Sequence, residues 1–282
     1  MTTARRAARA RLMATAALAL VTAAAVQRAG DDSDAALPVQ FAEGSLHGFL
    51  ELRTAAGAYL ASGDLLQRLR GTILESRMVF HFADSSYFEE AVDFTQRGVF
   101  SLISYRLVQR GPAFEHNLDA RLERNGRYSV RSRKRGEEEK SEEGTLELPP
   151  DIANGMVIVL TKNLPAGRAE QVHIVAFTPK PRLIGLELAP EGQDDVAMGQ
   201  RTVTTRRYVF KPKLGTLLGI AARVTGQFPP DSRAWIVTGD VPAFVRFQGP
   251  LYDGPAWRID LLGPQWEHPP VIPPPQPNPR GR

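Results

Sequence analysis

Histidine side chains are the first candidates for metal chemistry in this chain of 282 residues. His47, His81, His116, His173 and His268 stand far apart, and none belongs to an H-x-H or H-E-x-x-H pattern. Zinc sites commonly take closely spaced histidines from one element. The chain also contains no cysteine, which excludes thiolate ligands, disulfides and a cysteine nucleophile. The sequence therefore predicts no metal site and no cofactor.

Carboxylates are the next candidates, because a glycosidase-type site needs two of them facing one substrate. Glu51, Glu75, Glu89, Glu90 and Asp93 all fall on segments expected to be strands. Successive strand residues point to opposite faces, so Glu89 and Glu90 cannot act as a pair. The serine-hydrolase elbow, the Walker loop and the dinucleotide fingerprint are all missing from the sequence. We predict that the chain is not an enzyme, and keep a hydrolase with an unrecognised site as a further alternative.

Apolar side chains provide a better candidate site. Three phenylalanines lie on expected strands, and three apolar residues spaced by four would share one face of a helix. A methionine among them suits an apolar pocket, because its flexible side chain fills irregular space. We predict that these residues bind a lipid or another apolar small molecule, or else fill the core of a structural or interaction protein. The predicted lining residues are Phe80, Phe82, Phe100, Ile152, Met156 and Leu160.

The elements that must position these residues are mostly strands. In TILESRMVFHF, residues 72–82, apolar and polar side chains alternate, which is typical of a strand with one wet face. About eleven or twelve such runs recur with short turns between them, for example at Asn125-Gly126. Short connections favour antiparallel pairing. We predict a mainly β fold over residues 41–266: one large curved antiparallel sheet, a half-barrel, with one or two short helices on its concave face.

PPDIANGMVIVLTKNLP, residues 149–165, interrupts the strand pattern. Asp151 after two prolines is a suitable N-cap, Lys162 suits the C-terminal end of a helix dipole, and Pro165 ends the segment. These signals predict a helix over 151–164 that closes the curved sheet as a lid or plug. A second short helix or turn is expected at 215–226, between two glycines.

The middle of the chain also resembles a known family. Strands, an Asp151-led apolar helix with Leu160, the turn Asn163-Leu164-Pro165 and a strand pair that includes Lys180 follow one another. This order resembles DUF3108, a family of exported bacterial proteins of unknown function, over about residues 41–266. The resemblance implies a fold similar to the lipoprotein carriers of the LolA and LolB type, an antiparallel half-barrel with helices in its hollow. The lipobox cysteine of a LolB-like anchored receptor is missing.

Both termini differ from the rest of the chain. Four arginines precede an apolar run at 12–26, and Ala23-Ala24-Ala25 fits a signal-peptidase site. The run is shorter than the ~20 residues that span a bilayer, although an uncleaved anchor is the alternative. We predict a signal peptide at 1–25, a flexible linker at 26–40, and a disordered proline-rich tail at 267–282. The expected location is the periplasm or cell envelope.

Charge argues against nucleic acid as a partner. The whole chain has 35 Lys and Arg against 31 Asp and Glu, but the excess equals the four arginines of the predicted signal peptide. The mature chain is therefore close to neutral. A charged hairpin at 131–143 places Arg131, Arg133 and Lys134 before Gly136 and several glutamates after it, so that its arms should face each other. This hairpin or the tail is the expected surface for an envelope protein partner.

Overall fold

A computed structural model describes residues 36–177, 180–198, 201–213 and 231–262. The predicted signal peptide, the second short helix at 215–226 and the proline-rich tail lie outside the described residues. Within the described part of the chain, no helix is long and apolar enough to cross a membrane.

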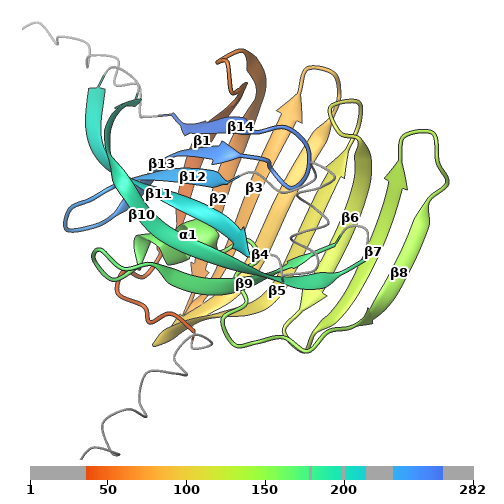
Figure 1. Ribbon diagram of the computed structural model, residues 1–282, viewed down its shortest axis with the longest axis horizontal. Coiled ribbons are helices and arrows are strands. Elements are labelled where there is room, and N and C mark those ends of the chain that lie inside the picture. Colours follow the sequence, from red (N-terminus) through yellow and green to blue (C-terminus); the bar gives the residue numbers. More distant parts are fainter. Residues whose placement is uncertain (1–35, 178–179, 199–200, 214–230, 263–282) are drawn as a thin grey trace, which may run out of the picture.

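The described strands form one antiparallel sheet that curves around a short helix (Figure 1). The strand order is β8-β7-β6-β5-β4-β3-β2-β1-β14-β13-β12-β11-β10-β9, so β8 and β9 lie at its two ends and the sheet is not closed. The fold class predicted from the sequence is confirmed. The elements are β1 (Leu46–Thr54), β2 (Tyr59–Arg70), β3 (Ile73–Phe82), β4 (Tyr87–Arg97), β5 (Val99–Arg110), β6 (His116–Glu123), β7 (Arg127–Lys134), β8 (Lys140–Thr145), α1 (Val157–Lys162), β9 (Glu170–Ala176), β10 (Arg182–Met198), β11 (Arg201–Lys213), β12 (Ser232–Val237), β13 (Ala243–Gly249) and β14 (Trp257–Leu261).

Alternation of apolar and polar residues fixes the register of the sheet. Phe80 faces Gly63 on β2 and Phe88 on β4, and all three side-chain positions belong to the concave face. Gly63 is required there, because a Cβ at this position would lie 2.4 Å from the Phe80 ring. Register shifts at Leu52/Arg53 and Asp93/Phe94 mark irregularities of the kind that bend a sheet.

β2 is not among the strands predicted from the sequence. It contains Gly63 and Asp64, which are uncommon in strands. β10 is the longest of the described strands, Arg182–Met198, and has a register shift between Pro190 and Gly192. Asp194 therefore lies inside this strand and accepts hydrogen bonds from Arg207 at 2.6 Å and from the Trp235 indole at 2.7 Å.

The helix starts later than predicted. α1 spans Val157–Lys162, and its N-cap residue is Met156 without a side-chain cap. Asp151 does not cap a helix: its carboxylate accepts a hydrogen bond from His173 Nδ1 at 2.8 Å. Residues 151–153 instead pair in parallel with β9, through Ala153 N–H to the His173 carbonyl at 2.7 Å. The β-branched residues that weaken the helix propensity therefore leave only a short helix.

The charged hairpin forms as β7 and β8, but its arms pair differently from the prediction. Arg131 lies opposite Ser141, and Glu142 lies opposite Val130. The basic residues and the glutamates are therefore out of register, and the connection at 135–139 removes three glutamates from the ladder. Arg131 instead approaches Asp119 on β6, at 3.7 Å.

The folded domain begins before residue 41, the predicted boundary. Pro38 forms a β-bridge with Val99, and Val39 N–H donates to the Gly98 carbonyl at 2.9 Å. The Asn163 side chain, which is fully buried, binds the backbone of Gln40 and Phe41. The described residues of the predicted linker, 36–40, are thus attached to the sheet and to the end of α1.

Candidate functional site on the concave face

The residues predicted to line a ligand site all lie in the main core cluster of the concave face. Their exposed fractions range from 0% for Phe80 and 1% for Met156 to 9% for Phe82. Phe82 packs against Phe114 and Trp257, with ring centroids 5.5 and 5.6 Å apart. The structure thus brings together the two sets of residues that the sequence suggested, one from strands and one from the helical segment. Ligand contact by these residues stays a prediction.

A neighbouring strip of the same face is less tightly covered. Leu65 on β2, Met78 on β3 and Leu261 on β14 are only partly buried, although they pack against the core cluster. Alternation places them on the concave side: Leu65 comes two residues after Gly63, Met78 two residues before Phe80, and Leu261 two residues after Ile259. Partly exposed apolar side chains on an inner face are what a site for an apolar ligand requires.

Backbone register makes this strip continuous. Glu90 on β4 lies opposite Met78, Met78 lies opposite Leu65, and Leu65 lies opposite Gly48. Because Gly48 has no side chain, Leu261 on β14 can lie over it and approach Leu65. A Cβ on Gly48 would lie 2.9 Å from Leu261 Cδ1 and 3.8 Å from Leu65 Cβ. We call Glu90, Met78, Leu65, Gly48 and Leu261 the inner row. It crosses four strand spacings, about 19 Å.

Glu90 is the charged member of the inner row. The Tyr105 hydroxyl donates a hydrogen bond to Glu90 Oε1 at 2.9 Å. No cationic side chain of the described residues forms an ion pair with Glu90. The most buried acids, in contrast, have basic partners: Glu43 pairs with Lys162 at 2.5 Å, and Asp151 pairs with His173 at 2.8 Å.

Burial determines the ionisation of this group. Desolvation raises the pKa of the Glu90 carboxyl above its ordinary value of 4.5, and the Tyr105 hydrogen bond offsets only part of the effect. The pKa of Tyr105 is raised well above 10, also mainly by burial, and further by the Glu90 charge. Glu90 nevertheless keeps part of its own surface exposed. Glu90 is therefore a largely desolvated carboxyl on the inner face of the sheet that the protein covers only in part.

A second polar group lies beside the inner row. Gln67 on β2 is 8% exposed, and its Oε1 has no hydrogen-bond partner among the described residues. Gln67 lies opposite Ser76, which is two residues from Met78 on the same face of β3. Glu90, Ser76 and Gln67 therefore run diagonally across three neighbouring strands of an otherwise apolar face. An unpaired buried acceptor is costly, which makes it a candidate for binding a donor.

Sequence reasoning found part of this site. The alternation over residues 72–82 puts Met78 on the apolar face with Phe80, and Glu90 is a predicted strand carboxylate that points away from Glu89. Leu65 and Gln67 were missed because β2 was not recognised as a strand. The signal that would have found them is the alternation of Ala61, Gly63, Leu65 and Gln67 themselves.

The residues that carry the family resemblance are mainly structural. Asn163 is 0% exposed and donates to the Val159 and Phe41 carbonyls, while its Oδ1 accepts the Gln40 and Phe41 N–H groups. It thereby fastens the segment before β1 to the end of α1. Lys180, in contrast, is exposed.

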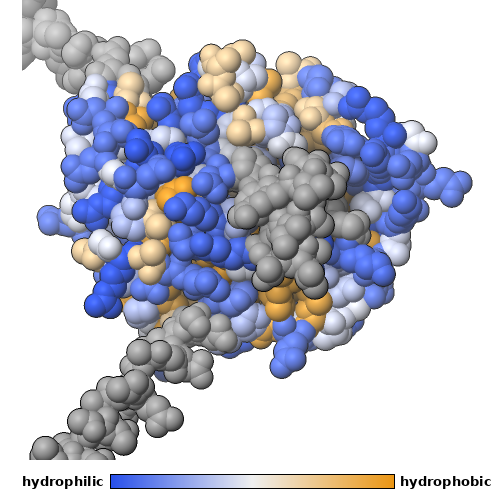
Figure 2. Space-filling view, in the orientation of Figure 1, coloured by the Kyte–Doolittle hydropathy of each residue, from blue (hydrophilic) through white to orange (hydrophobic). Residues whose placement is uncertain are grey.

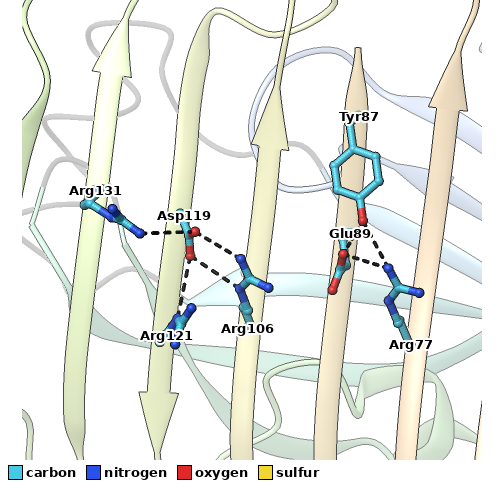
Figure 3. A network of polar contacts seen from close by, with 7 residues as sticks. All are labelled: Arg77, Tyr87, Glu89, Arg106, Asp119, Arg121 and Arg131. Carbon is cyan, nitrogen blue, oxygen red and sulfur yellow. Dashed lines mark hydrogen bonds and ion pairs between the residues drawn. The ribbon is translucent and has the colours of Figure 1, made fainter. Parts of the chain in front are cut away.

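The convex face carries the second candidate, a network of charged residues across β3–β7 (Figure 3). Arg77 donates to Glu89 Oε2 at 3.0 Å, and the Tyr87 hydroxyl donates to the same oxygen. Burial alone would raise the pKa of Glu89, but the hydrogen bonds from Arg77 and Tyr87 outweigh it and lower this pKa. The same contact raises the pKa of Arg77.

Asp119 is the other centre of this network. Arg106 and Arg131 lie 3.1 and 3.7 Å from Asp119 Oδ2, and Arg121 lies 3.9 Å from Asp119 Oδ1 (Figure 3). A parallel row on the same face holds acids, with Glu75 opposite Asp93. Charges of both signs therefore alternate over this face, which is typical of a solvated surface rather than a binding site. The side of the molecule that Figure 2 shows, where β10 and β11 lie in front, is likewise mainly hydrophilic, with separate hydrophobic areas.

No group of three or more His, Cys, Asp or Glu side chains that would hold a metal ion occurs in the described part of the chain. Comparison with known proteins adds little. No family model and no curated protein matches the chain. Among solved structures, the chain is similar to a beta-barrel-like protein of the domain of unknown function DUF1849 from Brucella abortus. That likeness has a TM-score of 0.41 and 10% identity, and covers 78% of this chain and 97% of the other. A likeness this distant supports no conclusion about function.

Proposed function

We propose that this chain is an exported protein of the cell envelope that holds an apolar ligand, such as a lipid, on the concave face of its half-barrel. The observation that carries the proposal is the inner row, where Met78, Leu65 and Leu261 remain partly exposed beside a closely packed core. Burying such side chains under an apolar ligand is worth about 25 cal/mol per Å² of apolar surface.

A further feature supports the proposal. The N-terminal arrangement of arginines, an apolar run and small residues is that of a secretory signal. The resemblance to DUF3108 and to the LolA and LolB type of carrier belongs to the same proposal.

Adjacent residues on β2 allow a matched test. Leu65→Trp places a large ring on the concave face, whereas Leu66→Trp places the same ring on the convex face, where Leu66 is 38% exposed. We expect Nile red, a neutral apolar dye, to bind the wild type and the Leu66→Trp variant equally. Leu65→Trp should weaken binding about tenfold or more, because the ring occupies the ligand's place. Equal binding of the dye by both variants would show that the ligand site is not on the concave face at Leu65.

A second candidate function is that of an envelope structural or interaction protein with a filled core. The close packing of Phe80, Met156 and Leu160, which are 0–3% exposed, favours it. This candidate predicts that the wild type binds no apolar dye at all. In that case the surfaces to examine are the β7–β8 hairpin and the proline-rich tail.

A further inference from the structure

The polar residues of the concave face give information about the ligand's head. Glu90 and Gln67 both offer oxygen atoms as acceptors, and Ser76 lies between them. A ligand that fits this face must bring hydrogen-bond donors to these atoms. Its remaining part must be apolar, because Met78, Leu65 and Leu261 continue the row away from Glu90.

The lack of a basic partner for Glu90 among the described residues indicates which kind of hydrogen-bond donor the ligand must carry. Glu43, Glu89 and Asp151, which are less than a tenth exposed, each have a basic partner within 3.0 Å. Glu90 has a tyrosine hydroxyl, which does not neutralise a carboxylate. A buried carboxylate without a cation is costly, and a cation supplied by the ligand removes that cost.

We propose that the inner row binds an elongated apolar molecule carrying a protonated amine, with Glu90 contacting the ammonium group and Gln67 accepting a further hydrogen bond. This inference rests on the proposed function and names the ligand class for the same site. Charge-assisted hydrogen bonds are about twice as strong as neutral ones, so the ammonium should dominate head-group selectivity.

Simple alkyl probes test the ligand class. Dodecylamine, dodecanol and dodecanoate share one alkyl chain and differ in the head, and each is measured by displacement of Nile red at about pH 8. The wild type should prefer dodecylamine over dodecanol about tenfold or more, since one charge-assisted bond supplies that factor. Dodecanoate should bind more weakly than dodecanol, because two carboxylates repel.

Adjacent glutamates provide the matched variants. Glu90→Gln keeps the shape and the bond from Tyr105 but removes the charge, so the preference for the amine should disappear while Nile red and dodecanol still bind. Glu89→Gln makes the same change on the convex face and should keep the preference. Equal binding of amine and alcohol by the wild type, or a preference that survives Glu90→Gln, would overturn the ligand class but leave an apolar site. Failure of the wild type to bind Nile red would overturn both proposals.

Discussion

At the residue scale, Glu90 combines a cost to folding with a position suited to binding. Its carboxyl has a raised pKa because it is buried without a cation. The neutral form is thus favoured in the folded state. Below about pH 4.5, the pKa in the unfolded chain, the carboxyl is neutral and its full contribution to stability is present. This contribution is lost as the pH rises through the raised pKa of the folded state, because the carboxyl then ionises while buried.

Glu90→Gln should remove this loss. We expect thermal melting to show similar stability of the variant and the wild type near pH 4, and a more stable variant at pH 8 in the absence of ligand, because glutamine carries no charge to desolvate. Glu89→Gln serves as the control and should be destabilised at pH 8, since Arg77 and Tyr87 lose their carboxylate partner. A constant difference between Glu90→Gln and the wild type at all pH values would contradict the burial of this carboxyl.

On the convex face, the ion pair of Arg77 with Glu89 makes stability depend on pH in the opposite direction. The lowered pKa of Glu89 contributes stability that is present above its unfolded value of 4.5 and is lost as the pH falls through the folded value. Arg77→Met should cost about 1–3 kcal/mol in the free energy of unfolding at pH 7, because Glu89 is mostly buried and loses a donor.

Arg131→Met is the control for Arg77→Met. Arg131 is well exposed and lies 3.7 Å from Asp119, which keeps its closer contact with Arg106. Urea denaturation should show a change of less than about 0.5 kcal/mol for this variant. Equal losses for the two arginines would mean that the network does not depend on the burial of Glu89.

At the element scale, the segment 151–162 has two structural roles, although the sequence predicts a single helix there. Its first part covers the edge of β9, through the backbone bonds between Ala153 and His173. Its second part is α1, whose buried face holds Val159, Leu160 and Thr161. An uncovered edge strand invites pairing with other chains, so the first part is protective. Charged residues on β8 protect the other edge.

Alanine substitutions of Met156 and Ile158 distinguish a packing role of this segment from a ligand-binding role. Met156 is 1% exposed, so Met156→Ala should cost about 2–5 kcal/mol in the free energy of unfolding, measured by urea denaturation. Ile158 is partly buried, and Ile158→Ala should cost less. A Met156→Ala loss below about 1 kcal/mol would show that this side chain borders empty space, and would return it to the ligand site.

Much of the architecture was predictable from the sequence, and the exceptions have physical causes. Alternation identified most strands, because burial on one face imposes a period of two. β2 was missed since Gly63 and Asp64 are uncommon in strands, and the close packing of Gly63 against Phe80 becomes visible only in the sheet. The helix start was misjudged because Asp151 met a long-range partner, His173. Likewise, the apolar candidates were visible, but the exposed inner row depends on cross-strand register that no local pattern encodes.

At the scale of the whole molecule, the chain is an open half-barrel whose inner face carries the main apolar core and whose outer face carries a charged network across β3–β7. The segment at 36–45 and the end of α1 are joined by the Lys162–Glu43 ion pair, which is largely buried.

Export is the prediction that belongs to this scale. If residues 1–25 are a signal peptide, N-terminal sequencing of protein recovered from the envelope should begin near Val26. The small residues at Ala23 and Ala25 fit the cleavage site that the peptidase requires. Recovery of intact Met1 from a membrane fraction would replace the cleaved signal with an anchor.

The central claim is that the concave face holds an apolar ligand, and native mass spectrometry of protein purified from its own envelope tests it most directly. We predict a mass above that of the polypeptide, released on denaturation as an apolar molecule with an amine, and lost in the Leu65→Trp variant but kept in Leu66→Trp. The mass of the bare polypeptide for the wild type, or an adduct that both variants retain equally, would contradict the claim.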